Sequence, residues 1–223
     1  MSGTLYPDEE QRRRIMDFIM AAGETLLQNG AEVFRVEQTM EIMAQSFHLR
    51  EFHVYVLTNG IFASAGTAEI SEVRNVPVRI THLGRVAAVN ELSRQIAAGS
   101  VTLDEAECRL AQAQHIPFPN GWVQLVAGMS GAFCFALIFG GTLRAGLVAA
   151  VAGFLASGHL FLCERRNISG GFKTISTAAL ITLLCILGCS LLRIGASHAI
   201  IGTLMILTPG IAFTMGIRDF VQG

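Results

Sequence analysis

The stretch LTPGIAFTMGIRDFVQG, residues 207–223, holds the residues whose types and spacing suggest chemistry most directly. Pro209 and Gly210 interrupt an apolar run, and Arg218 and Asp219 end it. A proline inside a helix removes one backbone hydrogen bond and costs about 3 kcal/mol, and a glycine adds roughly 1 kcal/mol. We expect the carbonyl of Met205 to lose its intrahelical donor, so the break should face protein or a wet cavity.

Broken helices of this kind form the substrate sites of many transporters, because freed carbonyls and helix ends coordinate polar cargo. Thr203, Thr208 and Thr214 would place hydroxyl groups beside the break. An ordinary proline kink used for helix packing is the alternative. The predicted substrate pathway consists of Thr208, Pro209, Gly210, Thr214, Arg218 and Asp219.

The charges of the chain are segregated between its two halves. Residues 1–115 hold ten of the sixteen basic residues and fifteen of the seventeen acidic ones. Beyond them, uncharged stretches run over 116–143, 145–163, 174–192 and 194–217, of 28, 19, 19 and 24 residues. A spanning helix needs about 20 predominantly apolar residues. We therefore predict a transmembrane domain over 116–223, with spans at about 122–141, 145–163, 174–192 and 198–217.

Loop charges and the N-terminus predict the orientation. The N-terminus is polar and lacks the apolar segment of a signal peptide, so the first half is expected to stay in the cytosol. The loop after the second span carries Arg165, Arg166 and Lys173 against Glu164, whereas each opposite loop carries one basic residue. This bias agrees with a cytoplasmic N-terminal domain.

Residues 1–115 have the pattern of a small α+β domain. An apolar stripe over 8–29 and the segment FRVEQTMEIMAQSF predict two helices separated by Gly30. HVYVL, IFASA and VPVRIT predict a meander of three or four strands, and two helices follow over 83–99 and 103–114. Thr102 and Glu105 have the spacing of a capping box. Glu32, Arg35 and Glu37 are expected on a solvated helix face.

Small residues recur every fourth position in the first two predicted spans, which allows close approach of helix backbones in lipid. They are predicted to pack the helices: Gly128, Ala132, Ala136, Gly140, Ala145, Ala149, Gly153 and Ser157.

The sequence offers no pattern typical of an enzyme. His48, His53, His82 and His115 have no recognisable metal-ligand or nucleophile spacing, and no glycine-rich phosphate loop follows a strand. The spans lack a set of acid, base and nucleophile at depth, and only His159 and His198 are ionisable within them. The net charge of −5 over residues 1–115 argues against nucleic acid as a partner. We therefore expect no catalysis, cofactor or metal.

Several motifs in order resemble the threonine/serine exporter family. PGIAFTMGIRDFVQG resembles that family's Pro-Gly and Arg-Asp signature, and LLQNGAEVFRVEQTM, VTLDEAECRL and FALIFGG resemble its earlier motifs. The resemblance implies a cytoplasmic N-terminal domain joined to membrane segments, either in one chain or split between a larger subunit like this one and a small membrane partner. It also implies export of threonine and serine, or of succinate by split members, without an ATP site.

These observations predict a polytopic α-helical membrane protein of the bacterial inner membrane with four spans and a cytoplasmic α+β domain. We expect one subunit of a secondary exporter of small polar metabolites, in contact with lipid and acting as a homo-oligomer or with a small membrane partner. The alternative is a membrane-anchored sensor or scaffold whose cytoplasmic domain binds a ligand or a partner.

Overall fold

The computed structural model describes residues 9–66, 70–76 and 80–208, with Gly210, Thr214, Gly216, Ile217, Phe220 and Val221. The chain divides into two compact units, Met1–Phe118 and Pro119–Gly223. The division lies close to the drop in charge density after residue 115.

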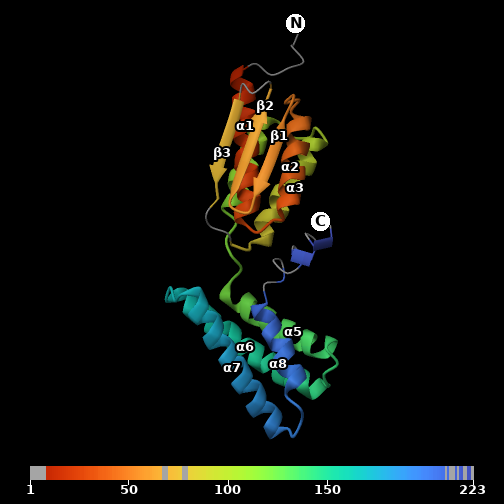
Figure 1. Cartoon of the computed structure of the whole chain (residues 1–223), viewed down its shortest axis with the longest axis vertical. Helices are drawn as coiled ribbons and strands as arrows, with labels where there is room; N and C mark the ends of the chain where they lie inside the picture. The colour runs from red at the N-terminus through yellow and green to blue at the C-terminus, as the bar shows by residue number, and fades with distance from the viewer. Residues whose placement is uncertain are drawn as a thin grey trace. The chain divides into compact units, whose positions relative to one another are not determined.

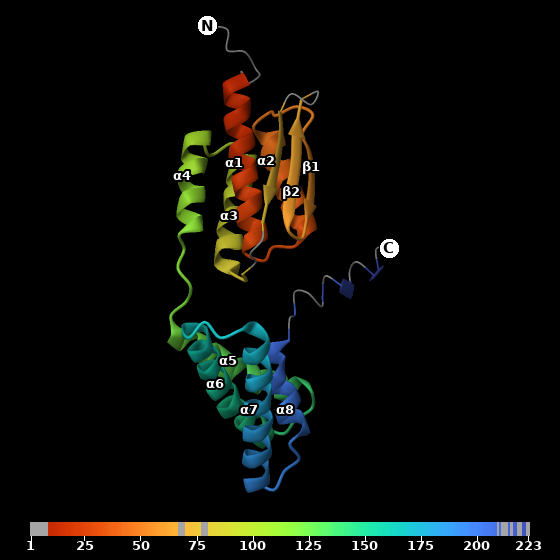
Figure 2. The same cartoon turned by 60° about the vertical axis from the view of Figure 1, so that its left-hand side comes forward.

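The N-terminal unit has a three-stranded antiparallel sheet covered on one face by helices (Figures 1 and 2). Helices α1 and α2 lie on the sheet, and α3 and α4 lie behind them. The elements are α1 (Glu9–Gln28), α2 (Val33–Ser46), β1 (His53–Leu57), β2 (Gly60–Ala65), β3 (Ile70–Asn75), α3 (Leu83–Ala97) and α4 (Leu103–Gln114). The strands follow one another in the sheet as β1-β2-β3, so the predicted meander is confirmed with three strands in the described residues.

The position of the third strand was predicted wrongly. We expected VPVRIT, 76–81, but β3 is Ile70–Asn75, and Val76, Ile80 and Thr81 lie outside any strand. Residues 77–79 lie outside the described part of the chain. The inner face of β3 carries Glu72 and Arg74, which pair with each other, and Arg74 also pairs with Glu24 of α1. Because these inward positions are charged, β3 lacks the alternation of apolar and polar residues that predicts a strand.

The predicted apolar stripe of α1 forms the centre of the unit. Its members Ile15, Phe18, Ile19, Ala22, Leu26 and Leu27 are all buried. Gly30 ends this stretch with φ +88°, a conformation that favours glycine. A Cβ there would lie 3.2 Å from the Ile80 carbonyl oxygen, so the turn is also crowded. The helix positions and the turn confirm the prediction for its described residues, 9–47.

Two local contacts in this unit bear on the sequence predictions. The Thr102 hydroxyl accepts from the Glu105 N–H, and the Glu105 carboxylate accepts from the Thr102 N–H, which confirms the capping box. Glu37, expected on a solvated face, instead accepts a hydrogen bond of 2.8 Å from the Val56 N–H of β1. Its carboxylate therefore satisfies a strand donor, and that expectation was wrong for Glu37.

The second unit is helical, with α5 (Gly121–Ile138), α6 (Leu143–Arg165), α7 (Gly170–Leu191), α8 (Ser197–Leu204) and a 3₁₀ turn, η1 (Met205–Leu207). The first three are long and apolar enough to cross a membrane. The fourth predicted span, 198–217, stays a prediction: the described apolar helix covers Ser197–Leu207, and residues 209, 211–213 and 215 lie outside the described part of the chain. At 1.5 Å per residue, this segment is about 16 Å long, roughly half of a bilayer core.

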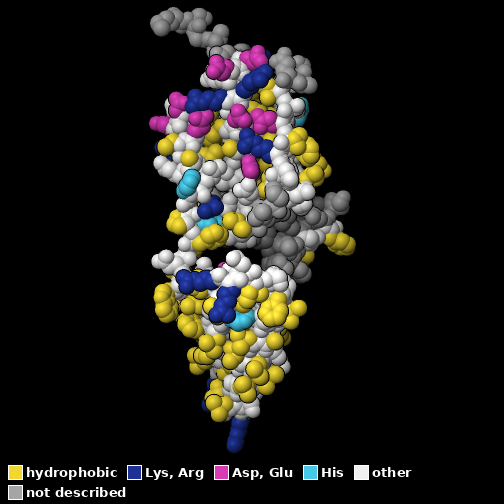
Figure 3. All heavy atoms as spheres, turned by 90° about the vertical axis from the view of Figure 1, so that its left-hand side faces the viewer, with side chains coloured by type: hydrophobic (Ala, Val, Ile, Leu, Met, Phe, Trp, Pro, Cys, Tyr) yellow, Lys and Arg dark blue, Asp and Glu magenta, His cyan; other side chains and the backbone are white. Residues whose placement is uncertain are grey.

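The surfaces of the two units differ in kind. In Figure 3 acidic and basic side chains are interspersed over the N-terminal unit, whereas hydrophobic side chains dominate the helical unit. Basic side chains gather at the two ends of the helical unit in that view. The basic residues lie at or near the ends of the long helices. Arg165, Arg166 and Lys173 lie around the turn between α6 and α7, and Arg144 and Arg193 lie near the opposite ends of these helices. This distribution suits a segment whose middle lies in hydrocarbon.

Candidate functional site

The short apolar helix α8 ends in a break at Thr208. Helix α8 tightens into η1, and Thr208 then adopts an extended conformation with φ −74° and ψ 127°. Proline disfavours the helical conformation in the residue before it, which explains why the helix stops at Thr208, directly before Pro209. The interruption that the Pro-Gly pair predicts is therefore present in the described residues.

The hydrogen bonds at the break differ from those we expected. The Met205 carbonyl is not left free, because the Thr208 N–H donates to it at 3.2 Å, closing the 3₁₀ turn. The Thr208 hydroxyl donates to the Leu204 carbonyl at 3.4 Å, and the Gly210 N–H donates to the Thr208 carbonyl at 2.8 Å. Local groups thus satisfy part of the backbone that the proline disrupts, as 3₁₀ turns commonly do at helix ends.

The remaining residues of the predicted pathway are only partly described. Thr214 donates its hydroxyl hydrogen bond to the Gly210 carbonyl at 3.0 Å. Thr208, Gly210 and Thr214 are all exposed. Pro209, Arg218 and Asp219 lie outside the described residues. The structure therefore connects Thr208, Gly210 and Thr214 through local hydrogen bonds and leaves Pro209, Arg218 and Asp219 unassigned.

Small residues allow α5 and α6 to meet backbone to backbone. A Cβ at Gly153 would lie 2.6 Å from both the Ala132 Cβ and the Gly128 carbonyl oxygen. A Cβ at Gly128 would overlap the Ser157 hydroxyl. Ala136, Ala145 and Ala149 are also buried. Gly140, by contrast, lies beyond the end of α5 with φ +88°, and a Cβ there would have no neighbour within 4 Å.

The half-length helix α8 packs on α5 through a glycine that the sequence pattern did not reveal. A Cβ at Gly202 would lie 2.5 Å from the Ala136 nitrogen and 2.6 Å from its Cα. Gly202 is the single glycine of α8 and is not part of a row of small residues at every fourth position. The spacing rule used for α5 and α6 therefore did not predict this contact. This close contact packs α8, the part of the helix before the break, directly on α5.

A buried hydroxyl lies just before the break. Thr203 is fully buried, and its hydroxyl donates to the Ala199 carbonyl at 2.8 Å. It also lies 3.5 Å from the Ala149 carbonyl of α6 and 3.7 Å from the Cys185 sulfur of α7. Thr203 therefore connects α8 to α6 and α7 five residues before Thr208.

A second polar contact lies near the Arg165 end of the bundle. The Thr177 hydroxyl donates to the Lys173 carbonyl at 2.6 Å, so it accepts from His159 Nδ1 at 3.0 Å. Cys163 lies 3.7 Å from both ring nitrogens of His159. His198, the other ionisable residue of the spans, is exposed near the start of α8. Neither histidine contacts the break through any hydrogen bond that involves described residues.

The N-terminal unit has a depression between α3 and α4 with a volume of about 380 Å³, lined among others by Glu91, Gln95, Arg109 and Gln112. Arg109 donates to Gln95 there, and the hydrogen bond from Arg94 lowers the pKa of Glu91. Among the described residues, no group of three or more His, Cys, Asp and Glu side chains could hold a metal ion.

Three long apolar helices and a shorter, interrupted one define a multi-pass α-helical membrane protein. The family model described as "Putative threonine/serine exporter" matches residues 17–223. The chain therefore belongs to the threonine/serine exporter family, a family of exporters rather than enzymes.

One curated relative covers nearly the whole chain. The protein named "Probable threonine/serine exporter" of Mycobacterium tuberculosis (strain ATCC 25618 / H37Rv) is 24% identical over 221 residues. The match includes 97% of this chain and 42% of the relative, so this chain spans less than half the length of that protein. No solved structure matches the chain.

Proposed function

We propose that this chain is one component of a secondary exporter of small polar metabolites, and that its substrate pathway passes the break at Thr208. The observation that carries the proposal is the interruption of an apolar helix about 16 Å from its start, a length of roughly half a bilayer core. Interrupted helices at that depth are tolerated where they line a cavity, and they bind substrates in many transporters.

The substrate class is that of the family name, threonine and serine, or a dicarboxylate such as succinate. Hydroxyls and carbonyls around Thr208 suit a polar solute, and both candidates offer several hydrogen-bonding groups. An anionic substrate would also need a cation, which Arg144, Arg193 or Arg218 near the membrane ends would supply.

The exporter is proposed to need more than one copy of this chain, or a small membrane partner. Within the described residues, three long apolar helices and one interrupted helix are a small basis for a closed pathway. We place the assembly in the bacterial inner membrane with the N-terminal unit in the cytoplasm, as the excess of Arg165, Arg166 and Lys173 in one loop supports.

A membrane-anchored sensor is the second candidate function. The depression between α3 and α4, with Arg109 and Glu91 at its lining, favours it as the place where a small polar ligand would bind. In that case the spans would anchor the chain, and the break would serve only packing.

The deciding experiment restores a regular helix at the break. Pro209→Ala with Gly210→Ala regains a hydrogen bond and helix propensity, so the protein should still insert. Efflux of labelled threonine, serine and succinate from loaded cells, at matched membrane abundance and with any partner subunit present, should fall to background. Asp219→Asn should reduce efflux less, because an interfacial charge also has an anchoring role.

Gly195→Ala is the matched control at the other end of α8, because a Cβ there would have no neighbour within 4 Å. It should leave efflux unchanged. Normal efflux by the double alanine variant would show that the break is a packing kink and would favour the sensor.

A further inference from the structure

The outer face of the N-terminal sheet carries a row of large apolar side chains. Tyr55, Phe62 and Val73 lie directly opposite one another across β1, β2 and β3. They are 63%, 43% and 67% exposed, and Leu57 on the same face is 38% exposed. Helices α1 and α2 cover the other face (Figure 2). An antiparallel sheet with one covered face usually has polar residues on the open one, so this row indicates an interaction surface.

This outer face is also free of formal charge at its strand positions. Alternation along the three described strands places His53, Ser64, Ser71 and Asn75 beside the apolar row, and no Asp, Glu, Lys or Arg among these outward positions. The acidic and basic residues of β3, Glu72 and Arg74, point to the helical side, where they pair with each other and Arg74 also pairs with Asp17 and Glu24 of α1. The rest of the unit is rich in acid, with a net charge of −5 over residues 1–115.

We propose that this outer face is a homodimer interface, on which a second copy of this chain packs its own sheet face to face. Two acid-rich units repel wherever their helical surfaces meet, and this neutral face lets them approach without pairing like charges. Flat antiparallel sheets pack in this way about 10 Å apart, and a two-fold axis brings each apolar row against the other. The inference does not depend on transport.

The same charges argue against a lipid surface as the occupant. Segments that lie on anionic membranes carry lysine and arginine around their apolar residues. The outward positions of these strands carry neither, and an acidic unit is repelled by anionic headgroups. A second copy therefore fits the chemistry better.

The size of the face sets the strength of the dimer. Side chains of roughly 150–250 Å² with these exposed fractions offer on the order of 400 Å² per copy, about half of the 800 Å² in a standard interface. Such a contact is weak between free molecules, but confinement in one membrane raises the effective concentration of the two copies. The dimer should therefore form in membranes and weaken on dilution in detergent.

Crosslinking of the full chain in native membranes tests the proposal. In a background with Cys108→Ser and Cys134→Ser, Phe62→Cys should give a crosslinked dimer with a short bifunctional thiol reagent. Ala111→Cys, on the exposed side of α4, is the matched control and should stay monomeric. Adding Val73→Lys should abolish the Phe62→Cys crosslink, because two lysines would be buried against each other across the two-fold axis.

Val73 is mostly exposed, so Val73→Lys should leave the melting temperature of the detergent-solubilised chain unchanged. An unchanged melting temperature would show that the loss of the crosslink does not result from misfolding. Two outcomes overturn the proposal. One is a Phe62→Cys product with a different protein instead of a second copy. The other is a Phe62→Cys thiol that reacts with a monofunctional reagent but gives no dimer, which would leave a free or lipid-facing surface.

Discussion

The two units of this chain place their large and small side chains in opposite ways. The N-terminal unit buries long side chains, including Met16, Met20, Leu27, Met40 and Met43. The core of the helical unit consists largely of alanine, with Cys185, Cys189 and Ile181, while its leucines and phenylalanines face outward.

The difference follows from the solvent of each unit. Water drives large apolar side chains inward, and each fully buried one contributes about 1.5–3 kcal/mol. Lipid gives no such drive, so helices in a membrane associate through close backbone contact, which only small residues permit. The N-terminal unit should therefore be sensitive to lost volume, and the helical unit to added volume.

The largest effect is expected from added volume at Gly153. Gly153→Leu would place a side chain where even a Cβ lies 2.6 Å from the Gly128 backbone, so α5 and α6 must separate. Overpacking typically costs 1–3 kcal/mol, and about 3 kcal/mol or more is expected here because backbone cannot yield. The melting temperature of the detergent-solubilised chain, followed by size-exclusion chromatography, should fall sharply.

Gly131→Leu is the control on α5, because a Cβ at Gly131 would have no neighbour within 4 Å. It should melt near the temperature of the unsubstituted chain. Equal loss in both variants would mean that the close contact between α5 and α6 is not what holds the bundle.

Features that depend on a local pattern of residues could be predicted well. The period of α1 located its buried stripe, and Thr102 with Glu105 identified a helix start, because both signals lie within one or two turns. The Pro-Gly pair located the break, since proline acts on its immediate neighbours. Membership of the exporter family was also accessible, because its motifs are spread over most of the chain.

Features that depend on contacts between distant segments were not accessible. Glu37 accepts a hydrogen bond from a strand residue 19 positions later, and the inward face of β3 carries Arg74, which pairs with Glu24 of α1. Gly202 meets Ala136 across two helices, so no spacing rule within α8 could identify it. A local contact was also missed at the break, where the Thr208 N–H donates to the Met205 carbonyl that Pro209 cannot serve.

The next effect is expected from lost volume at Leu27. Leu27→Ala leaves a cavity in the N-terminal core, where Leu27 is fully buried, and should cost about 2–5 kcal/mol. Hydrogen exchange of the α1 and α2 peptides should accelerate accordingly. Leu147→Ala on α6 removes the same atoms from an outward-facing position that is 56% exposed, and it should leave exchange in the bundle nearly unchanged. Similar losses at both sites would contradict the proposed role of the solvent.

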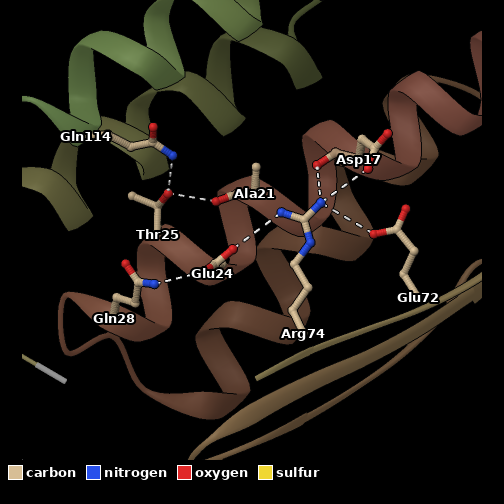
Figure 4. Close-up of polar contacts among 8 residues, drawn as sticks. All are labelled: Asp17, Ala21, Glu24, Thr25, Gln28, Glu72, Arg74 and Gln114. Atoms are coloured by element: carbon tan, nitrogen blue, oxygen red, sulfur yellow. Dashed lines mark hydrogen bonds and ion pairs between the residues drawn. The ribbon is translucent and has the colours of Figure 1, made fainter. Parts of the chain in front are cut away.

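The smallest effect is expected where charge, rather than volume, is buried in the N-terminal unit. Three carboxylates surround the guanidinium of Arg74: Asp17 at 3.2 Å, Glu24 at 3.4 Å and Glu72 at 3.4 Å (Figure 4). One cation among three acids leaves an excess of negative charge. Burial first, and then the charge of Asp17, raise the pKa of Glu72 above its ordinary value.

A raised pKa in the folded state means that the folded unit holds the proton of Glu72 more tightly than the unfolded chain. The stability from that proton is present below the ordinary glutamate pKa and is lost as the pH rises through the raised value. Glu72→Gln should remove this loss. The variant should match the unsubstituted chain in acid and be equally or slightly more stable at neutral pH, by less than about 1 kcal/mol.

Glu91→Gln is the control with the opposite pH dependence, because Arg94 lowers the pKa of Glu91. The stability that Glu91 contributes is lost as the pH falls. Exchange rates of α1 peptides between pH 4 and 7, corrected for intrinsic chemical exchange, provide the measurement. A marked loss of protection in Glu72→Gln at neutral pH would mean that the ion pair with Arg74 outweighs the cost of burying the carboxylate.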